Sequence, residues 1–129
     1  MNPPTLSDGR LTTHLPAEPA STRRARRFVV EALSGWSCSH LSENAALLTS
    51  ELVTNAVLHA HSEVDLRVTR TDGGVLIEVM DEDPSPVEPS PAPLYATHGR
   101  GLVLVDALAR DWGIEPRTPG KSVWFELSG

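Results

Sequence analysis

The sequence has a single cysteine, Cys38, and aromatic residues make up only 5% of its 129 positions. One cysteine excludes an internal disulfide and any multi-cysteine metal site. No apolar run approaches the roughly 20 residues that a membrane span needs. Residues 1–5 lack the basic start and apolar stretch of a signal peptide. These absences predict a cytoplasmic protein with no membrane contact.

Basic residues are also scarce, because 11 Lys and Arg stand against 17 Asp and Glu, for a net charge of −6. Broad binding to nucleic acid draws its affinity from neutralised phosphates, so this balance argues against it. Four of the arginines nevertheless gather in one short stretch: Arg23, Arg24, Arg26 and Arg27. Such a cluster usually forms a solvated helix face, and a docking patch for a partner is the alternative.

Hydrophobic residues at 40% and charged residues at 22% are ordinary for a folded chain, and the length suits one domain. Residues 1–19 carry four prolines and little periodicity, which predicts an extended arm with one edge strand near residues 10–15. The domain itself is expected at residues 20–129.

Two periodic segments predict amphipathic helices. From Ser21, apolar residues recur at i, i+3, i+4, i+7 and i+8, and Gly35 ends the pattern. A second helix is expected from Ser42, which is placed to cap it. Its packed stripe consists of Ala45, Leu48, Leu52 and Ala56. A third, buried helix is expected at residues 101–110.

Alternating residues predict strands at 64–69 and 75–81, joined by the turn Thr71-Asp72-Gly73-Gly74, and two further strands at 112–115 and 122–127. Five prolines between positions 84 and 93 exclude regular structure there, so residues 84–98 are expected to be a loop that covers a binding site. Hairpins with helices predict a two-layer α/β sandwich. Its mostly antiparallel sheet would be covered on one face by the helices.

The pair Glu51 and Asn55 is the strongest indication of function. A helix holds both side chains on one side, beside the apolar stripe. A carboxylate and a carboxamide in that position need partners, and a Mg²⁺ ion with a polyphosphate would supply them. An exposed polar edge on a core helix is the alternative.

Asp81 and the segment Gly99-Arg100-Gly101-Leu102 add two further candidates. Asp81 ends a strand, where its carboxylate can accept a hydrogen bond from an exocyclic amine such as that of adenine, or can simply begin a turn. The glycines lead into a helix whose free amides attract phosphate, although taken alone they are better explained by a tight turn after the loop.

Three other motifs are set aside. Gly120-Lys121-Ser122 is not a phosphate loop, since Glu115 stands where that motif needs glycine. His59 and His61 point apart and lack a third ligand, so zinc is not expected. No nucleophile context for a hydrolase triad is present.

Glu51-Leu52-Val53-Thr54-Asn55-Ala56, Asp81 and Gly99-Arg100-Gly101-Leu102, in this order, resemble the motifs of the Bergerat-type ATPases, which include histidine kinases and gyrase. The sequence is most similar to bacterial anti-sigma-factor serine/threonine kinases. The resemblance covers about residues 20–127, and the helix motif is its most specific part.

The resemblance implies that ATP and Mg²⁺ are cofactors. Asn55 would ligate Mg²⁺, Glu51 would act as general base toward a substrate hydroxyl, and Asp81 would bind the adenine amine. Gly99, Gly101 and Leu102 would line the phosphates, and Arg100 would add a positive charge there. The implied partners are a sigma factor or an antagonist protein, phosphorylated on serine or threonine. A homodimer is left open.

One segment departs from the family pattern. The family continues its strand-end aspartate as Asp-x-Gly-x-Gly, whereas here Asp81 is followed by Glu82-Asp83-Pro84-Ser85, without either glycine. Two extra acids would repel a polyphosphate that they faced. Two alternatives therefore stay open: a nucleotide-binding regulator without kinase activity, and a protein-interaction module without nucleotide.

Overall fold

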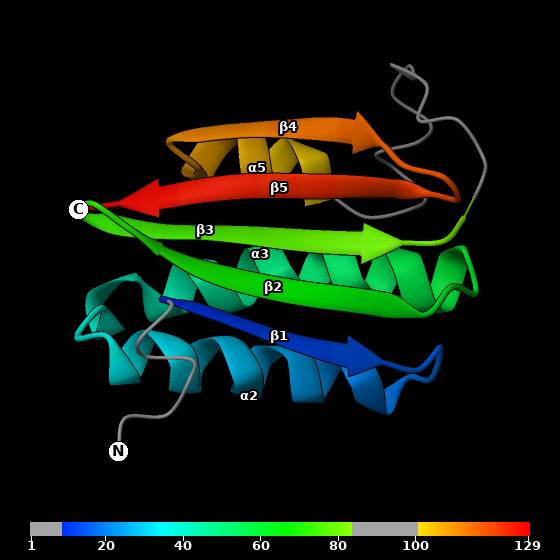
Figure 1. The fold of residues 1–129 in the computed structure, drawn as a ribbon, viewed down its shortest axis with the longest axis horizontal. Helices are drawn as coiled ribbons and strands as arrows, with labels where there is room; N and C mark the ends of the chain where they lie inside the picture. The colour runs from blue at the N-terminus through cyan, green and yellow to red at the C-terminus, as the bar shows by residue number, and fades with distance from the viewer. Residues whose placement is uncertain (1–8, 84–100) are drawn as a thin grey trace.

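A five-stranded antiparallel sheet forms one layer of the structure, and helices form the other (Figure 1). The computed structural model describes residues 9–83 and 101–129. The strand order is β1-β2-β3-β5-β4. The strands are β1 (Arg10–Leu15), β2 (Val64–Thr71), β3 (Gly74–Asp81), β4 (Asp111–Pro116) and β5 (Lys121–Ser128). The expected sandwich is confirmed, including the edge strand at residues 10–15.

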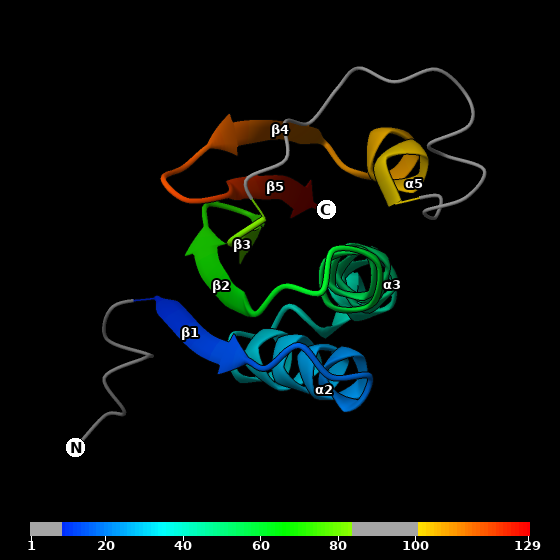
Figure 2. The ribbon, with the colours of Figure 1, turned by 90° about the vertical axis from the view of Figure 1, so that its right-hand side faces the viewer.

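The helices all cover the same face of this sheet, and the opposite face carries none of the described elements (Figure 2). The helices are α2 (Ala20–Gly35), η1 (Ser39–Leu41), α3 (Ser42–Thr54), η2 (Asn55–His59) and α5 (Gly101–Leu108). α3 lies between α2 and α5 and also contacts β3. α3 is therefore the central helix of its layer, in contact with both flanking helices and with the sheet.

The core lies between these two layers. In β3, Val75, Ile77 and Val79 are buried and point toward the helices. The expected stripe is buried opposite them, with Ala45, Leu48 and Leu52 on α3 and Ala56 on η2. Burying one such large aliphatic side chain contributes about 1.5–3 kcal/mol, so the apolar periodicity of the sequence fixes which face of each element turns inward.

The start of α3 differs from the expectation. Ser42 does not cap the helix, because η1 runs directly into α3 and Leu41 occupies the cap position. The Ser42 hydroxyl is buried and has no hydrogen-bond partner in the described part of the chain. The helix begins at Ser42 as expected, but the serine side chain is not its cap, and the Ser42 backbone amide donates to the Ser39 carbonyl of the preceding 3-10 turn.

The β2–β3 hairpin forms as expected and aligns the two strands so that Val64 pairs with Asp81. Its turn contains Gly73 at a φ of 79°, which a residue with a Cβ rarely adopts. The expected loop at residues 84–98 lies outside the described residues. Within residues 9–83 and 101–129, no helix combines the length and the hydropathy that crossing a membrane requires.

Candidate functional site

The buried carboxylate of Asp81 is the centre of the candidate site. Asp81 is the last residue of β3, and only 6% of its surface is exposed. One carboxylate oxygen lies 2.9 Å from the Lys121 ammonium, and the other accepts a hydrogen bond of 3.0 Å from the Asp83 backbone amide. A charge buried this deeply needs such partners, and Lys121 provides the opposite charge.

The alternation of the strands explains how these two residues meet. Asp81 follows Val75, Ile77 and Val79 on the helix-facing side of β3, and Lys121 is the matching position of β5. The residues around Lys121 are typical of a surface turn, and the pairing of Lys121 with a buried acid was not expected from them. The signal was available, because a lysine stands in phase with the buried residues of its own strand.

Glu51 and Asn55 lie on α3 and at its end. Both are partly exposed, and no described residue forms a hydrogen bond or an ion pair with either side chain. At Asn55 the α-helix gives way to the π-turn η2, in which the Asn55 carbonyl accepts a hydrogen bond from the Ala60 amide at 3.0 Å. Single π-turns within helices occur frequently at functional sites.

Three of the relevant chain ends lie on the same side of the molecule. In Figure 1 the C-terminal end of α3, the end of β3 and the beginning of β5 all lie at the right. The side-chain oxygens of Glu51 and Asn55 are hard donors, the kind that Mg²⁺ prefers. The donor set on α3 thus suits a hydrated magnesium ion held beside a phosphate.

The glycine segment is only partly described. α5 begins at Gly101, directly after the glycine motif as expected, and Leu102 packs half-buried against the core. Gly99 and Arg100 lie outside the described residues. α5 ends at Leu108, two residues before the expected end at Arg110, where the chain turns into β4.

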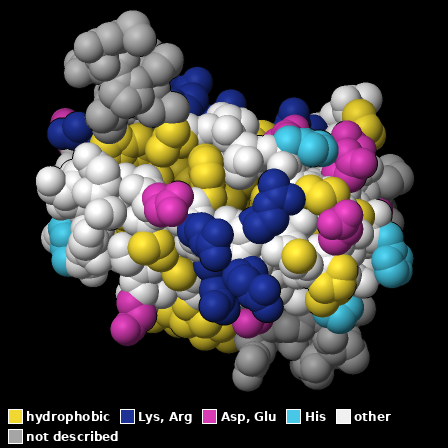
Figure 3. Space-filling model, turned by 90° about the horizontal axis from the view of Figure 1, so that it is seen from below, with side chains coloured by type: hydrophobic (Ala, Val, Ile, Leu, Met, Phe, Trp, Pro, Cys, Tyr) yellow, Lys and Arg dark blue, Asp and Glu magenta, His cyan; other side chains and the backbone are white. Residues whose placement is uncertain are grey.

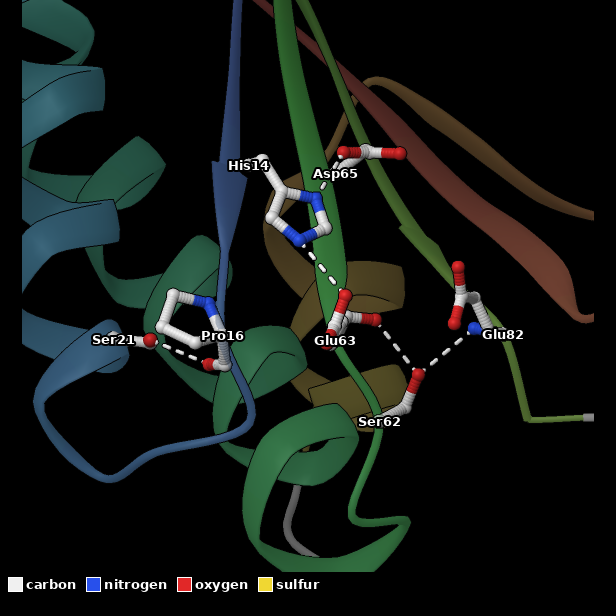
Figure 4. A network of polar contacts seen from close by, with 7 residues as sticks. All are labelled: His14, Pro16, Ser21, Ser62, Glu63, Asp65 and Glu82. Carbon is white, nitrogen blue, oxygen red and sulfur yellow. Dashed lines mark hydrogen bonds and ion pairs between the residues drawn. The ribbon is translucent and has the colours of Figure 1, made fainter.

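A second polar cluster lies near the ends of β1 and β2 and was not expected from the sequence (Figure 4). The His14 ring binds Asp65 through Nδ1 at 2.8 Å and Glu63 through Nε2 at 2.9 Å. These hydrogen bonds to two carboxylates raise the pKa of His14 above its ordinary value of 6.5. Nearby, the Ser62 hydroxyl accepts a hydrogen bond from the Glu82 amide.

This cluster borders a polar recess of about 80 Å³ that Arg117, Thr118 and Pro119 close from the other side. Neither Glu51 nor Asn55 lines it. Because His14 already binds both carboxylates, the cluster is an internal connection between β1 and β2. Asp81 lines the same recess, so the recess borders the candidate site at the end of β3.

A single antiparallel sheet with helices on one face, an oxygen-rich α3 and an acid at the end of β3 is the arrangement of the Bergerat-type ATPases. The chain belongs to this class: the model of the histidine kinase-like ATPase domain family matches residues 15–127. The family resemblance found in the sequence is therefore confirmed.

Two individual proteins are similar to the chain. It is 34% identical over 85 residues to the uncharacterized protein SCO4941 of Streptomyces coelicolor, which covers 62% of this chain and 81% of that protein. The crystal structure of the RsbU and RsbW domains of Rv1364c from Mycobacterium tuberculosis matches with a TM-score of 0.71 at 20% identity. That match covers 92% of this chain and 32% of the other, so it shows a shared fold with part of a longer protein.

Proposed function

We propose that this protein binds ATP with Mg²⁺ and regulates a partner of the anti-sigma-factor system, either a sigma factor or its antagonist. The observation that carries the proposal is the position of Asp81. This carboxylate is buried at a strand end, on the helix-facing side of the sheet and on the side of the molecule where α3 ends. Burying an acid at that position costs free energy that a purely structural strand end would not require.

In this proposal different residues of the chain bind the adenine, the phosphates and the Mg²⁺ ion. Asp81 accepts a hydrogen bond from the adenine amine, using lone pairs that Lys121 and Asp83 leave open. The N-terminus of α5 at Gly101 and Leu102, preceded by Gly99 and Arg100, faces the phosphates. Asn55 contributes an amide oxygen to Mg²⁺, which neutralises phosphate charge when it is bound.

Glu51 is the candidate general base. It lies one turn before Asn55 on α3, carries a carboxylate and makes no described interaction of its own. In a kinase reaction it would accept the proton of a serine or threonine hydroxyl on the antagonist as that oxygen attacks the γ-phosphate, and ADP would leave. The sequence similarity to anti-sigma-factor kinases supports this assignment.

Calorimetry with ATP in the presence and absence of Mg²⁺ tests the binding half of the proposal. The wild-type protein should release heat on binding ATP, and Asn55→Ala should lose the Mg²⁺-dependent part. His61→Ala is a matched control, because it changes an exposed residue a few positions along the chain. No heat from the wild type at millimolar ATP would contradict nucleotide binding and favour a module that binds proteins alone.

A regulator that binds nucleotide without transferring phosphate is the second candidate. Asp83 stands where the family pattern has its first glycine, and together with Glu82 it adds negative charge beside the proposed adenine position. Transfer of labelled γ-phosphate to a candidate antagonist separates the two. Binding without transfer, unchanged by Glu51→Ala, would favour this second candidate.

A further inference from the structure

The exposed face of α2 concentrates positive charge on a protein that is negative overall. Within five positions it carries four exposed arginines, whereas the helix has a single acid, Glu31. The arginines are Arg23, Arg24, Arg26 and Arg27. Figure 3 shows the face of the molecule on which α2 lies, with Lys and Arg side chains gathered near its middle.

Within residues 9–83 and 101–129, these arginines have no acidic partner. Among the described residues, the ion pairs are formed by other side chains, and no carboxylate pairs with any of the four. Arg23 and Arg27 are one turn apart and therefore lie side by side on the helix. A like-charge pair at this spacing destabilises a helix, and an external anion would relieve the repulsion.

The same face also offers an apolar contact. Val30 lies one turn after Arg26 and is 39% exposed, although Val29, Leu33 and the other apolar residues of α2 are largely buried. An exposed valine beside arginines is typical of a protein interface, where arginine is enriched around an apolar centre. The face thus combines charge with a hydrophobic anchor.

We propose that this α2 face docks an acidic, partly hydrophobic segment of a protein partner. The inference rests on the partner-binding half of the proposed function and does not require ATP. Arginine suits the role because its planar guanidinium binds carboxylates in pairs. The Arg23 and Arg27 side chains would hold two carboxylates of the partner, and Val30 would contact an apolar side chain between or beside them.

Size and charge favour a protein segment over the other anions. From Arg23 to Arg27 the helix rises only about 6 Å, which matches a few carboxylates and is short for a nucleic-acid backbone. Outside α2 the chain is strongly acidic. A long polyanion or an anionic membrane would extend beyond α2 and be repelled by these acidic residues.

Selection from a library of random peptides displayed on phage, with the wild-type protein as bait, tests the proposal without a known partner. The selected peptides should be rich in Asp and Glu with at least one large apolar residue. Fluorescence anisotropy then measures synthetic copies against Arg23→Glu/Arg27→Glu. The control, Arg70→Glu/Arg110→Glu, makes the same change of net charge at two exposed arginines outside α2.

The first variant should lose at least about tenfold in affinity, equivalent to about 1.4 kcal/mol, and the control should stay close to the wild type. Val30→Ser should also weaken binding. Equal binding by both double variants, neutral selected peptides or no selected peptides would overturn the proposal. Tighter, arginine-dependent binding to phosphatidylglycerol vesicles or to single-stranded RNA would overturn it in favour of that ligand.

Calorimetry with ATP and Mg²⁺ on the same variants keeps this inference separate from the nucleotide site. Arg23→Glu/Arg27→Glu should bind ATP as the wild type does, which also shows that it folds. If the wild type binds acidic peptides but no ATP, the nucleotide proposal fails and the docking surface stands. If the wild type binds ATP but peptide affinity is the same in Arg23→Glu/Arg27→Glu, the docking proposal is wrong and the nucleotide proposal is unaffected.

Discussion

Lys121 and Asp81 form an ion pair of 2.9 Å across the adjacent ends of β5 and β3. Both side chains occupy the phase of their strands that faces the helices, and the Asp81 side chain is only 6% exposed. Lys121 thereby balances the charge of the residue that we assign to adenine recognition. The pair also joins the end of β3, where the chain leaves the sheet, to the start of β5.

Replacing Lys121 by methionine should therefore destabilise the fold. The change leaves the Asp81 carboxylate buried with only the Asp83 amide as partner, and losing one member of a buried pair costs about 3 kcal/mol. Urea denaturation measures the loss. Adding Asp81→Asn should recover most of the stability, because no unpaired charge then remains. If the stability changes of Lys121→Met and Asp81→Asn simply add in the double variant, the two side chains do not stabilise each other and the prediction is wrong.

Glu51→Gln should separate binding from chemistry. The amide keeps the size of the side chain but is a far weaker base, so ATP affinity should stay within about threefold of the wild type while phosphate transfer falls by about 10²–10⁴-fold. Calorimetry and labelled phosphate transfer give the two values. A matched change at another exposed acid, Glu43→Gln, should alter neither. Transfer that survives in Glu51→Gln would remove Glu51 from the role of base.

His14 should make stability depend on pH in the neutral range. Because Asp65 and Glu63 raise its pKa in the folded state, the folded protein binds the proton more tightly than the unfolded chain does. The resulting stabilisation is fully present below pH 6.5, the ordinary pKa, and disappears as the pH rises through the raised value. His14→Gln should lose this component, so the difference between wild type and variant should shrink with rising pH.

Urea denaturation at several pH values between 5.5 and 8.5 measures this difference. Glu82 and Arg117 also line the recess beside His14, and they are unchanged in both proteins. His61→Gln is the control, since His61 is an exposed histidine that pairs with no carboxylate among the described residues. A difference that stays constant or grows with pH would contradict the role given to the His14 hydrogen bonds.

Two glycines should respond to alanine in opposite ways. A Cβ at Gly113 would lie 2.7 Å from Nε1 of Trp124, so the indole must move and stability should fall by about 1–2 kcal/mol. A Cβ at Gly35, the last residue of α2, would meet nothing within 4 Å. Gly35→Ala should therefore stabilise the helix by about 0.5 kcal/mol. Thermal unfolding compares both with the wild type, and a neutral Gly113→Ala would show that Trp124 is not fixed over β4.

Much of the fold could be predicted because local patterns and global packing agree. The alternation in residues 75–79 and the helical spacing in residues 45–56 each match a buried face in the structure. Ser42 is the exception. Its residue type favours a helix cap, but the 3-10 turn of η1, a result of how the chain enters α3, takes that position.

The sequence by itself determined the order of helices and strands, the inward faces and the acid–amide pair at Glu51 and Asn55. These follow from periodicity and residue type, which act over a few positions along the chain. Only the tertiary structure decided the partner of Asp81, the His14 connection and the π-turn at Asn55. Such contacts join residues from separate strands or depend on packing around a helix end, and the pairing of strands in space is what brings them together.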